Sequence, residues 1–491
     1  MEDQTWPARP IYSRRRVLAL GGAAAAAALL AACGSDNKNT AASTPAAGTT
    51  GGTASGAADT TLAAGTAAPN PSDTVSVNST GTASGGTNAA KFGGGGGDGT
   101  VKIGFTAPLT GALSGFGEAN PFILDAINKL AADGIMLGDK SYKVQIIQKD
   151  VESNSDTAAS RAGELITDDA VDLMLSIATP EMINPVADQC EANGVPCLST
   201  LAPWQPYFFG RGGDPAKGFD WTYHFFWGAD QLVKVFGDMW SSVQTNKTVG
   251  LLCPNDPDGN ALADPKTGFP AGIAAAGYTL VDPGRFQTLS DDFSSVIGQM
   301  KSGNVEIVAG IPIPPDFATF WNQAKQQGFN PKLVTMAKAV LFASAVEALG
   351  DAGNGLASEV WWTPNHPFSS SLTGESSKDL ADKYEASTGK QWTQFVGFVH
   401  ALFEVCFDVL ARAGSTDKQA ISDAAAATNL NTMVGPISYG KNGLPRNVSP
   451  TSLVGGQWKK ATGGKFPFEL LVVNNKQSPE IPTNGELTPL A

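Results

Sequence analysis

The stretch from Val171 to Trp204 is the part of the sequence that most constrains the fold. Val171–Ile177 is a mostly apolar run, which is typical of a strand buried on both faces of a sheet. Thr179 precedes a proline and is placed to cap a helix, and Gly194 is placed to end it. Val195–Leu198 is the next apolar run, and a loop with hydroxyls and an indole follows it. We therefore predict a strand–helix–strand unit that binds ligand at the carboxyl ends of its strands.

The same alternation is repeated on both sides of this unit. Further strands are expected at residues 101–105, 144–150, 248–254, 305–311 and 332–336. Helical periodicity is expected at residues 123–130, 157–166, 269–276, 293–300 and 317–324. The irregular segment Trp204–Gly228 separates two blocks of this pattern. The fold class is therefore predicted to be α/β, with two Rossmann-like parallel-sheet lobes.

A long apolar segment, Gln394–Ala413, is predicted to be a helix that packs on one of the sheets. The alternative is a membrane span, but Glu404, Asp408 and Arg412 interrupt the segment. From Val434 onward the pattern indicates strands and turns that complete the second lobe.

Composition excludes several classes of function. The 491 residues include 33 Lys and Arg against 46 Asp and Glu, so no nucleic-acid partner is expected. The three histidines have no metal-ligand spacing, and neither a metal nor a cofactor is expected. Gly115-Phe116-Gly117 continues to Asn120, so it fails the dinucleotide-binding fingerprint. No serine lies in a nucleophile-elbow motif, so an enzyme is not expected.

Residues 1–33 are predicted to be a signal peptide. Three arginines, Arg14–Arg16, precede the alanine-rich apolar run Val17–Ala32. Leu30–Cys33 resembles a bacterial lipobox, which implies that Cys33 is lipidated and becomes the mature N-terminus. An uncleaved membrane anchor is the alternative, but the run is too short and too rich in alanine to span well. Ser13–Leu18 also resembles a twin-arginine signal, so both the Sec and the twin-arginine routes stay open.

Residues 34–99 are rich in Gly, Ala, Thr and Ser and have almost no bulky apolar side chain. Such a composition buries too little surface to offset the entropy of ordering. The segment is therefore predicted to be a disordered linker between a membrane anchor and the folded domain.

Four segments in order resemble one family. They are VKIGFTAPLTGALSGFGE, VQIIQKDVESNSDTAASRAGELI, PVADQCEANGVPCLST and MVGPISYGKNG. The chain is similar over residues 100–476 to the branched-chain amino acid (leucine/isoleucine/valine) type of substrate-binding protein of ABC transporters, which has the type I periplasmic-binding-protein fold. The resemblance implies two lobes joined by a hinge of three crossover strands, with the ligand held between them. Lobe 1 would comprise residues 100–226 and 363–433, and lobe 2 residues 227–362 and 434–491.

The resemblance also implies ligand-binding residues. An aromatic ring that covers the ligand falls on Phe116, and a hydroxyl at the start of a helix falls on Thr179. A ligand carboxylate there would meet free backbone N–H groups. The end of the next strand falls on Ser199 and Thr200. The alternative for these hydroxyls is a plain helix cap and ordinary turn contacts.

The departures from the family pattern bear on the ligand. Asp258 stands where amino-acid binders have a tyrosine, and it is either a turn residue or a ligand contact. Lys338 falls near the place of the acid that pairs with the ligand ammonium. Unless Lys338 points to solvent, it would repel an α-ammonium and favour an anionic or neutral ligand. Trp204 and Trp227 add aromatic surface, either as a ligand wall or as loop packing.

Cys190 and Cys197 flank the turn between the predicted helix and strand. In an exported protein they form either a disulfide or two small buried side chains, and both interpretations stay open.

The leading hypothesis is a lipid-anchored receptor at the outer face of the cytoplasmic membrane. It would capture a branched-chain amino acid, or a related carboxylate or amide, and deliver it to an ABC permease and its ATPase. The alternative is a sensor of the same fold that signals ligand occupancy to a membrane partner.

Overall fold

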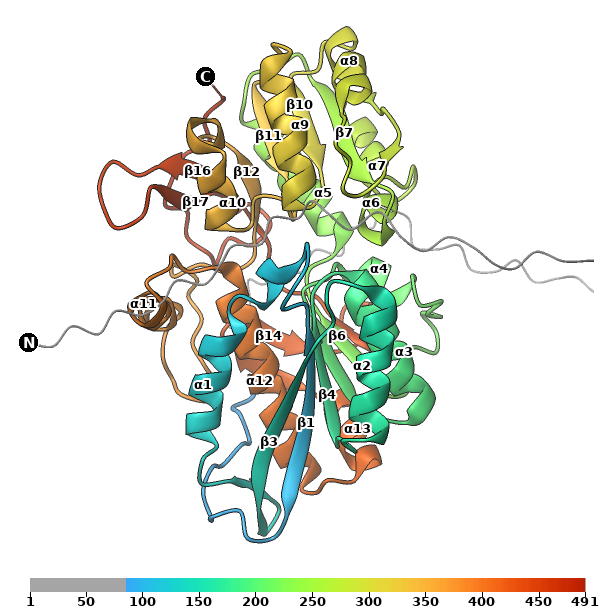
Figure 1. Ribbon diagram of the computed structural model, residues 1–491, viewed down its shortest axis with the longest axis vertical. Coiled ribbons are helices and arrows are strands. Elements are labelled where there is room, and N and C mark those ends of the chain that lie inside the picture. Colours follow the sequence, from blue (N-terminus) through green and yellow to red (C-terminus); the bar gives the residue numbers. More distant parts are fainter. Residues whose placement is uncertain (1–84, 491) are drawn as a thin grey trace, which may run out of the picture. The chain divides into compact units, whose positions relative to one another are not determined.

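The computed structural model describes residues 85–490, which are organised around two large sheets (Figure 1). The first sheet, in spatial order, consists of β15 (Val448–Ser449), β6 (Thr222–Phe225), β5 (Cys197–Thr200), β4 (Leu173–Ile177), β1 (Thr100–Ala107), β3 (Lys140–Asp150) and β2 (Ile135–Leu137). All its pairs are parallel except the β2–β3 hairpin. We call the part built on this sheet lobe 1.

The helices of lobe 1 pack in two groups. They are α1 (Asn120–Leu130), α2 (Ser155–Thr167), α3 (Pro180–Asn193), α4 (Trp204–Phe208), α11 (Ser377–Thr388), α12 (Gln394–Ala413) and α13 (Lys418–Ala426), with the 3-10 turn η1 (Ser114–Gly117). α2 packs against α3, whereas α12 packs against α1 and α13, and both groups contact the sheet. A hairpin of β13 (Asn429–Thr432) and β14 (Gly435–Ser438) also contacts α12.

The second sheet defines lobe 2. Its strands, in spatial order, are β17 (Phe468–Asn474), β16 (Val454–Lys460), β12 (Ala357–Val360), β11 (Leu333–Met336), β10 (Ile307–Gly310), β7 (Thr248–Pro254) and β8 (Thr279–Val281), with β9 (Arg285–Phe286) paired to β7. The strands β12, β11, β10, β7 and β8 pair in parallel, whereas β16 is antiparallel to both of its neighbours, β12 and β17. The helical elements are α5 (Ala229–Ser241), α6 (Pro257–Leu262), α7 (Phe269–Ala275), α8 (Ser294–Ser302), α9 (Pro314–Gln326), α10 (Ala343–Ala348) and the 3-10 turn η2 (Gly350–Gly353). The predicted α/β class with two parallel-sheet lobes is confirmed.

The unit predicted first in the sequence folds largely as expected. α3 begins directly after Thr179, whose backbone is extended, and has Pro180 in its first turn. It ends at Gly194, which adopts the left-handed conformation with φ 64°. A side chain with a Cβ would be strained there, which explains the glycine. The following strand begins two residues later than predicted, at Cys197.

The apolar helix α12 lies inside lobe 1. Among residues 85–490 it is the one helix long and apolar enough to cross a membrane, yet 94% of its most apolar window is buried in the protein. Its acidic residues have local partners, since Glu404 accepts a hydrogen bond from Met433 N (2.8 Å) and Asp408 pairs with Arg412 (2.8 Å). The prediction of a packed core helix is confirmed.

Three segments pass between the lobes, after β6, after β12 and after β15. The crossing residues are 226–228, 361–363 and 450–453, and none of these three segments forms a β-strand. The last crossing lies later than the expected boundary at residue 434. β15 is only two residues long but pairs with β6, so residues 434–449 stay with lobe 1.

The described chain begins inside the segment that composition predicts to be a disordered linker. Residues 85–99, which we call the N-terminal strap, pack on lobe 1 (Figure 1). Asn88 donates hydrogen bonds to Glu404 O (3.0 Å) and to Ser371 Oγ, and Phe92 meets Phe407 edge-to-face at 5.2 Å. The predicted linker boundary at residue 99 is therefore wrong, because backbone hydrogen bonds and one aromatic ring hold a glycine-rich strap in place.

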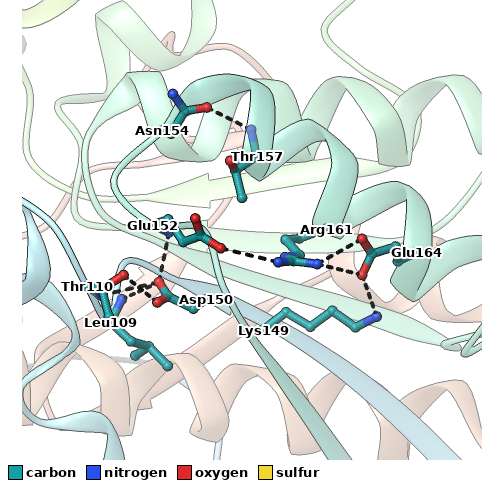
Figure 2. A network of polar contacts seen from close by, with 9 residues as sticks. All are labelled: Leu109, Thr110, Lys149, Asp150, Glu152, Asn154, Thr157, Arg161 and Glu164. Atoms are coloured by element: carbon teal, nitrogen blue, oxygen red, sulfur yellow. Dashed lines mark hydrogen bonds and ion pairs between the residues drawn. The ribbon is translucent and has the colours of Figure 1, made fainter. Parts of the chain in front are cut away.

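A polar network fixes the loop that follows β1 (Figure 2). Asp150, at the end of β3, accepts hydrogen bonds from Leu109 N (2.8 Å) and from Thr110 Oγ1 (2.6 Å). Burial opposes ionisation of Asp150, but these bonds and one from Glu152 N outweigh it and lower the pKa of the carboxyl. The network continues through Glu152 to Arg161, which lies in the middle of α2 and also pairs with Glu164 (Figure 2). The loop that carries Phe116 is thereby tied to the end of β3.

We expect Phe92→Ala to lower the free energy of unfolding by about 1–3 kcal/mol, because it removes a half-buried ring from the strap. Urea denaturation measures the change, and Lys91→Ala, at an exposed neighbouring position, is the control. An unchanged midpoint in Phe92→Ala would contradict the packing of the strap on lobe 1.

We expect Asp150→Asn to lower the free energy of unfolding at pH 7 by roughly 1–2 kcal/mol, because charge-assisted hydrogen bonds are lost. The pKa of Asp150 is lowered from 3.8, so its contribution is present above that pH and is lost as the pH falls through the folded-state value. The deficit should therefore shrink in urea denaturation at about pH 3. An equal deficit at both pH values would count against a role for the charge, and Asp139→Asn is the exposed control.

Candidate functional site

A small cavity lies where the two lobes meet. Its lining comes from lobe 1 (Phe116, Thr179, Leu201 and Pro203), from the crossing segments (Phe226, Trp227 and Trp361) and from lobe 2 (Asp258, Ile311, Lys338, Leu341 and Glu359). Five of the eight sequence-predicted ligand residues are therefore brought together: Phe116, Thr179, Trp227, Asp258 and Lys338.

The backbone around the cavity is strained at three strand ends. Ala178 follows β4 with φ 121°, Leu201 follows β5 with φ 81°, and Lys338 lies just beyond β11 with φ 63°. Side chains with a Cβ rarely adopt these conformations, and such strain collects at functional sites. In the parallel sheets the carboxyl ends of the strands thus face the cavity, as the sequence predicts for lobe 1.

Lys338 and Asp258 form a buried ion pair. The Lys338 Nζ lies 2.7 Å from Asp258 Oδ2 and 3.6 Å from Asp256 Oδ2. Burial by itself would lower the pKa of Lys338, but the surrounding carboxylates outweigh it and raise the pKa. Burial raises the pKa of Asp258, and the charge of Lys338 opposes that rise. Asp258 lies in the first turn of the helix α6 and is buried. The alternative that it serves only as a turn residue therefore does not describe it, since it pairs with Lys338.

Two more carboxyl groups surround Lys338. Glu359, on β12, accepts a hydrogen bond from the backbone N–H of Lys338 (3.2 Å) and one from Ser358 Oγ (2.8 Å). Burial raises the pKa of Glu359 to about 7. Glu181, in the first turn of α3, acts on Lys338 from lobe 1, so the cluster spans both lobes.

Several buried polar atoms of the lining have no hydrogen-bond partner among residues 85–490. They are Thr179 Oγ1, Trp227 Nε1, Trp361 Nε1 and Asp258 Oδ1. All four side chains belong to residues that are no more than 2% exposed. An unpaired buried polar atom costs about 1–3 kcal/mol, so such a cluster is typical of a site that a ligand completes.

Aromatic rings form the apolar part of the site. Phe116 contacts Phe342 of lobe 2 (ring centroids 5.8 Å apart) and Phe395 of α12 (5.0 Å). Trp361 meets Phe226 edge-to-face at 5.1 Å, so two of the crossing segments touch through their rings. The ring of Phe116, which the resemblance expects to cover the ligand, therefore contacts aromatic rings of both lobes.

The volume of this cavity is about 20 Å³, which is close to the room that one water needs. A larger hollow of about 830 Å³ lies in lobe 2 between α5 and α7. Its lining includes none of the unpartnered buried polar atoms found in residues 85–490. We therefore assign the candidate site to the small cavity, which must widen by movement of the lobes or of its rings to admit a solute.

Ser199 and Thr200 do not reach the cavity. Burial lowers the pKa of His224 to about 3, so its ring is neutral, and Nε2 donates to Ala202 O (2.8 Å). His224 Nδ1 therefore accepts the hydrogen bond from Ser199 Oγ (2.9 Å). Thr200 Oγ1 donates to Phe225 O (2.6 Å). Both hydroxyls link β5 to β6. Trp204 begins α4 and packs beside Phe209, which corresponds to the loop-packing interpretation.

Cys190 and Cys197 are buried free thiols in this structure, as are the two other cysteines of residues 85–490. The pKa of Cys190 is raised by burial and by hydrogen bonding to Cys197, so the two side chains are neighbours. Cys33, the predicted lipidation site, lies outside the described residues.

Sequence reasoning missed several residues of the site. Leu201, Ile311 and Trp361 each directly follow the last residue of a strand, which is a signal that the sequence carries. Glu359 lies inside β12 and gave no such signal. Within residues 85–490 no group of three or more His, Cys, Asp or Glu side chains is arranged to hold a metal ion.

Comparison with known proteins gives the family. The model of the periplasmic binding protein family matches residues 100–458. The Leu/Ile/Val-binding protein homolog 3 of Brucella melitensis is 24% identical over 70% of this chain and 88% of its own length.

Solved structures share the fold. The branched-chain amino acid transporter substrate-binding protein of Streptococcus pneumoniae, in complex with isoleucine, has 18% identity and a TM-score of 0.58 over 80% of this chain and 100% of its own. A solute-binding protein of Rhodopseudomonas palustris, in complex with 4-hydroxybenzoate, has 16% identity and a TM-score of 0.62 over 80% of this chain and 97% of its own. With two lobes, a polar cavity between them and a family match over most of its length, the chain belongs to the periplasmic binding protein family.

Proposed function

We propose that this protein is an extracytoplasmic receptor that binds a small solute between its lobes and delivers it to an ABC importer. The observation that carries the proposal is the cavity at the lobe junction, where buried polar atoms of both lobes lack partners within residues 85–490. Thr179 comes from lobe 1 and Asp258 from lobe 2, so a ligand that contacts both links the lobes.

Delivery requires that the transporter distinguish the loaded receptor from the empty one. A ligand that contacts both lobes binds the closed arrangement more tightly than the open one, and it therefore stabilises the closed arrangement. A permease that docks across both lobes would then engage the loaded form. The relatives named as a Leu/Ile/Val-binding protein and as a transporter substrate-binding protein support this role.

The ligand is a branched-chain amino acid or a related small carboxylate or amide with an apolar or aromatic body. Phe116, Phe226 and Leu341 supply apolar walls, and Thr179 lies at the start of α3, where backbone N–H groups favour a carbonyl or carboxylate oxygen. Isoleucine and 4-hydroxybenzoate, the ligands of the two solved relatives, have this general design.

The proposal also includes anchoring at the outer face of the cytoplasmic membrane through a lipid on Cys33. Its support is the lipobox-like sequence Leu30–Cys33. Export by either the Sec or the twin-arginine route is part of the proposal, because Ser13–Leu18 resembles a twin-arginine signal.

We expect at least one compound from a panel of aliphatic amino acids, aromatic acids, short carboxylates and amides to raise the Tm of the purified protein. A ligand at a hundred times its Kd adds about 2.7 kcal/mol to the free energy of unfolding. Differential scanning fluorimetry measures the shift, and calorimetric titration gives the Kd.

Thr179→Val is expected to weaken the compound found in this way about tenfold, because it removes one hydrogen bond in a buried site. Thr319→Val, which changes a hydroxyl on α9 away from the cavity, is the matched control. Absence of any shift across the panel, or an unchanged Kd in Thr179→Val, would contradict a solute site at the lobe junction.

A further inference from the structure

The charges around the cavity are unequal in number. Lys338 is the one cation in the lining, and Asp258 and Glu359 line the same cavity. Asp256 and Glu181 lie close enough to act electrostatically on Lys338. Carboxyl groups therefore outnumber the ammonium group, which changes the role that the sequence suggested for Lys338.

Lys338 is held to its carboxylate partners and is not free to serve a ligand. Its backbone has φ 63° and donates to Glu359 Oε1. Its Nζ lies between Asp258 Oδ2 (2.7 Å) and Asp256 Oδ2 (3.6 Å). The side chain is therefore directed to α6, and its charge is already neutralised.

A ligand carboxylate is disfavoured by this arrangement. It would add a negative charge to a buried cluster in which carboxyl groups already exceed cations, and burial of an unpaired charge is costly. The sequence-based argument that Lys338 favours an anion therefore does not follow once its partners are known.

The excess of carboxyl groups would by itself attract a ligand ammonium, but the acceptor open to that ammonium belongs to a carboxylate already shared with Lys338. This acceptor is Asp258 Oδ1, which has no hydrogen-bond partner within residues 85–490. The other oxygen of the same carboxylate already binds the Lys338 ammonium. Two ammonium groups on one carboxylate lie close together, and a like charge at that separation opposes binding.

The unpartnered atoms require both a donor and an acceptor from the ligand. Asp258 Oδ1 accepts, whereas Trp227 Nε1 and Trp361 Nε1 only donate, and the Thr179 hydroxyl does either. A primary or secondary amide offers a carbonyl oxygen and an N–H group on adjacent atoms without a formal charge.

We propose that the ligand is an uncharged amide with an apolar body, whose N–H donates to Asp258 and whose carbonyl accepts from the unpartnered N–H of Trp227 or Trp361. Lys338 is then the specificity-determining residue, because it takes the place at Asp258 that a ligand ammonium would occupy. This inference rests on the proposed function and narrows its ligand class.

The test uses compounds of matched shape that differ only in the head group. These are 4-methylpentanamide, 4-methylpentanoate and 4-methylpentylamine, together with benzamide, benzoate and benzylamine, and they are titrated into the purified protein at pH 7. Leucine is added as the zwitterion of similar size. We expect an amide to bind at least tenfold more tightly than the carboxylate and the amine of the same body.

The outcomes separate the two proposals. A carboxylate, an amine or leucine that binds as tightly as the matched amide overturns the inference while it supports a solute receptor. No binding by any compound of this panel or of the wider one overturns both.

Lys338→Met provides the second measurement. With the resident ammonium removed, Asp258 is free to bind a ligand ammonium, so the amine is expected to gain at least tenfold in affinity relative to the amide. Lys338→Arg keeps the positive charge and should keep the amide first, and Lys325→Met, at a lysine that lies over Trp321 on α9, should leave the order unchanged. A fixed order of affinities in Lys338→Met would overturn the role given to Lys338, and Lys338→Gln, which also removes the charge, serves the same comparison if the methionine variant does not fold.

Discussion

The direction of the parallel strands is the constraint on which the site depends. Hydrogen bonding in register between β4 and β5, and between β10 and β11, brings the carboxyl ends of each pair to one edge of its sheet. The residues that follow these ends must leave the sheet within one or two positions, and Ala178 and Lys338 do so with positive φ. The packing of the surrounding sheets holds the backbone in these strained conformations. The strained residues lie where polar groups of both lobes surround the small cavity.

Much of the fold could be predicted from local physical signals. The limits of α3 follow from Pro180 and Gly194, although the predicted cap by the Thr179 hydroxyl is not formed, and those of α12 follow from a sustained apolar periodicity. Signals of this kind act within one or two turns, so they are legible in the sequence. The strap at residues 85–99 has no such signal, because it is held chiefly by backbone hydrogen bonds to groups far away in the chain. The same holds for β15, whose two residues acquire meaning only beside β6.

For the candidate site as well, some features could be predicted from the sequence and others could not. Phe116, Thr179 and Lys338 were predicted from the resemblance to the family, and Thr179 also from its place at a predicted helix start, and the structure brings them to one cavity. The pairing of Lys338 with Asp258 could not be found, because it joins the ends of different strands. The hydrogen bond between Ser199 and His224 could not be predicted either, and it occupies a hydroxyl that was expected to face the ligand. The sequence therefore predicted five of the residues that line the cavity, whereas the partners of each side chain decide what it does there.

The attachment of the strap has a mechanical consequence. Its hydrogen bonds and ring contacts involve residues of lobe 1, such as Asn431, Glu404 and Phe407. A force applied to the preceding chain would therefore enter the folded protein through lobe 1. The lobe movement that the proposed function requires would therefore leave these contacts of the strap intact.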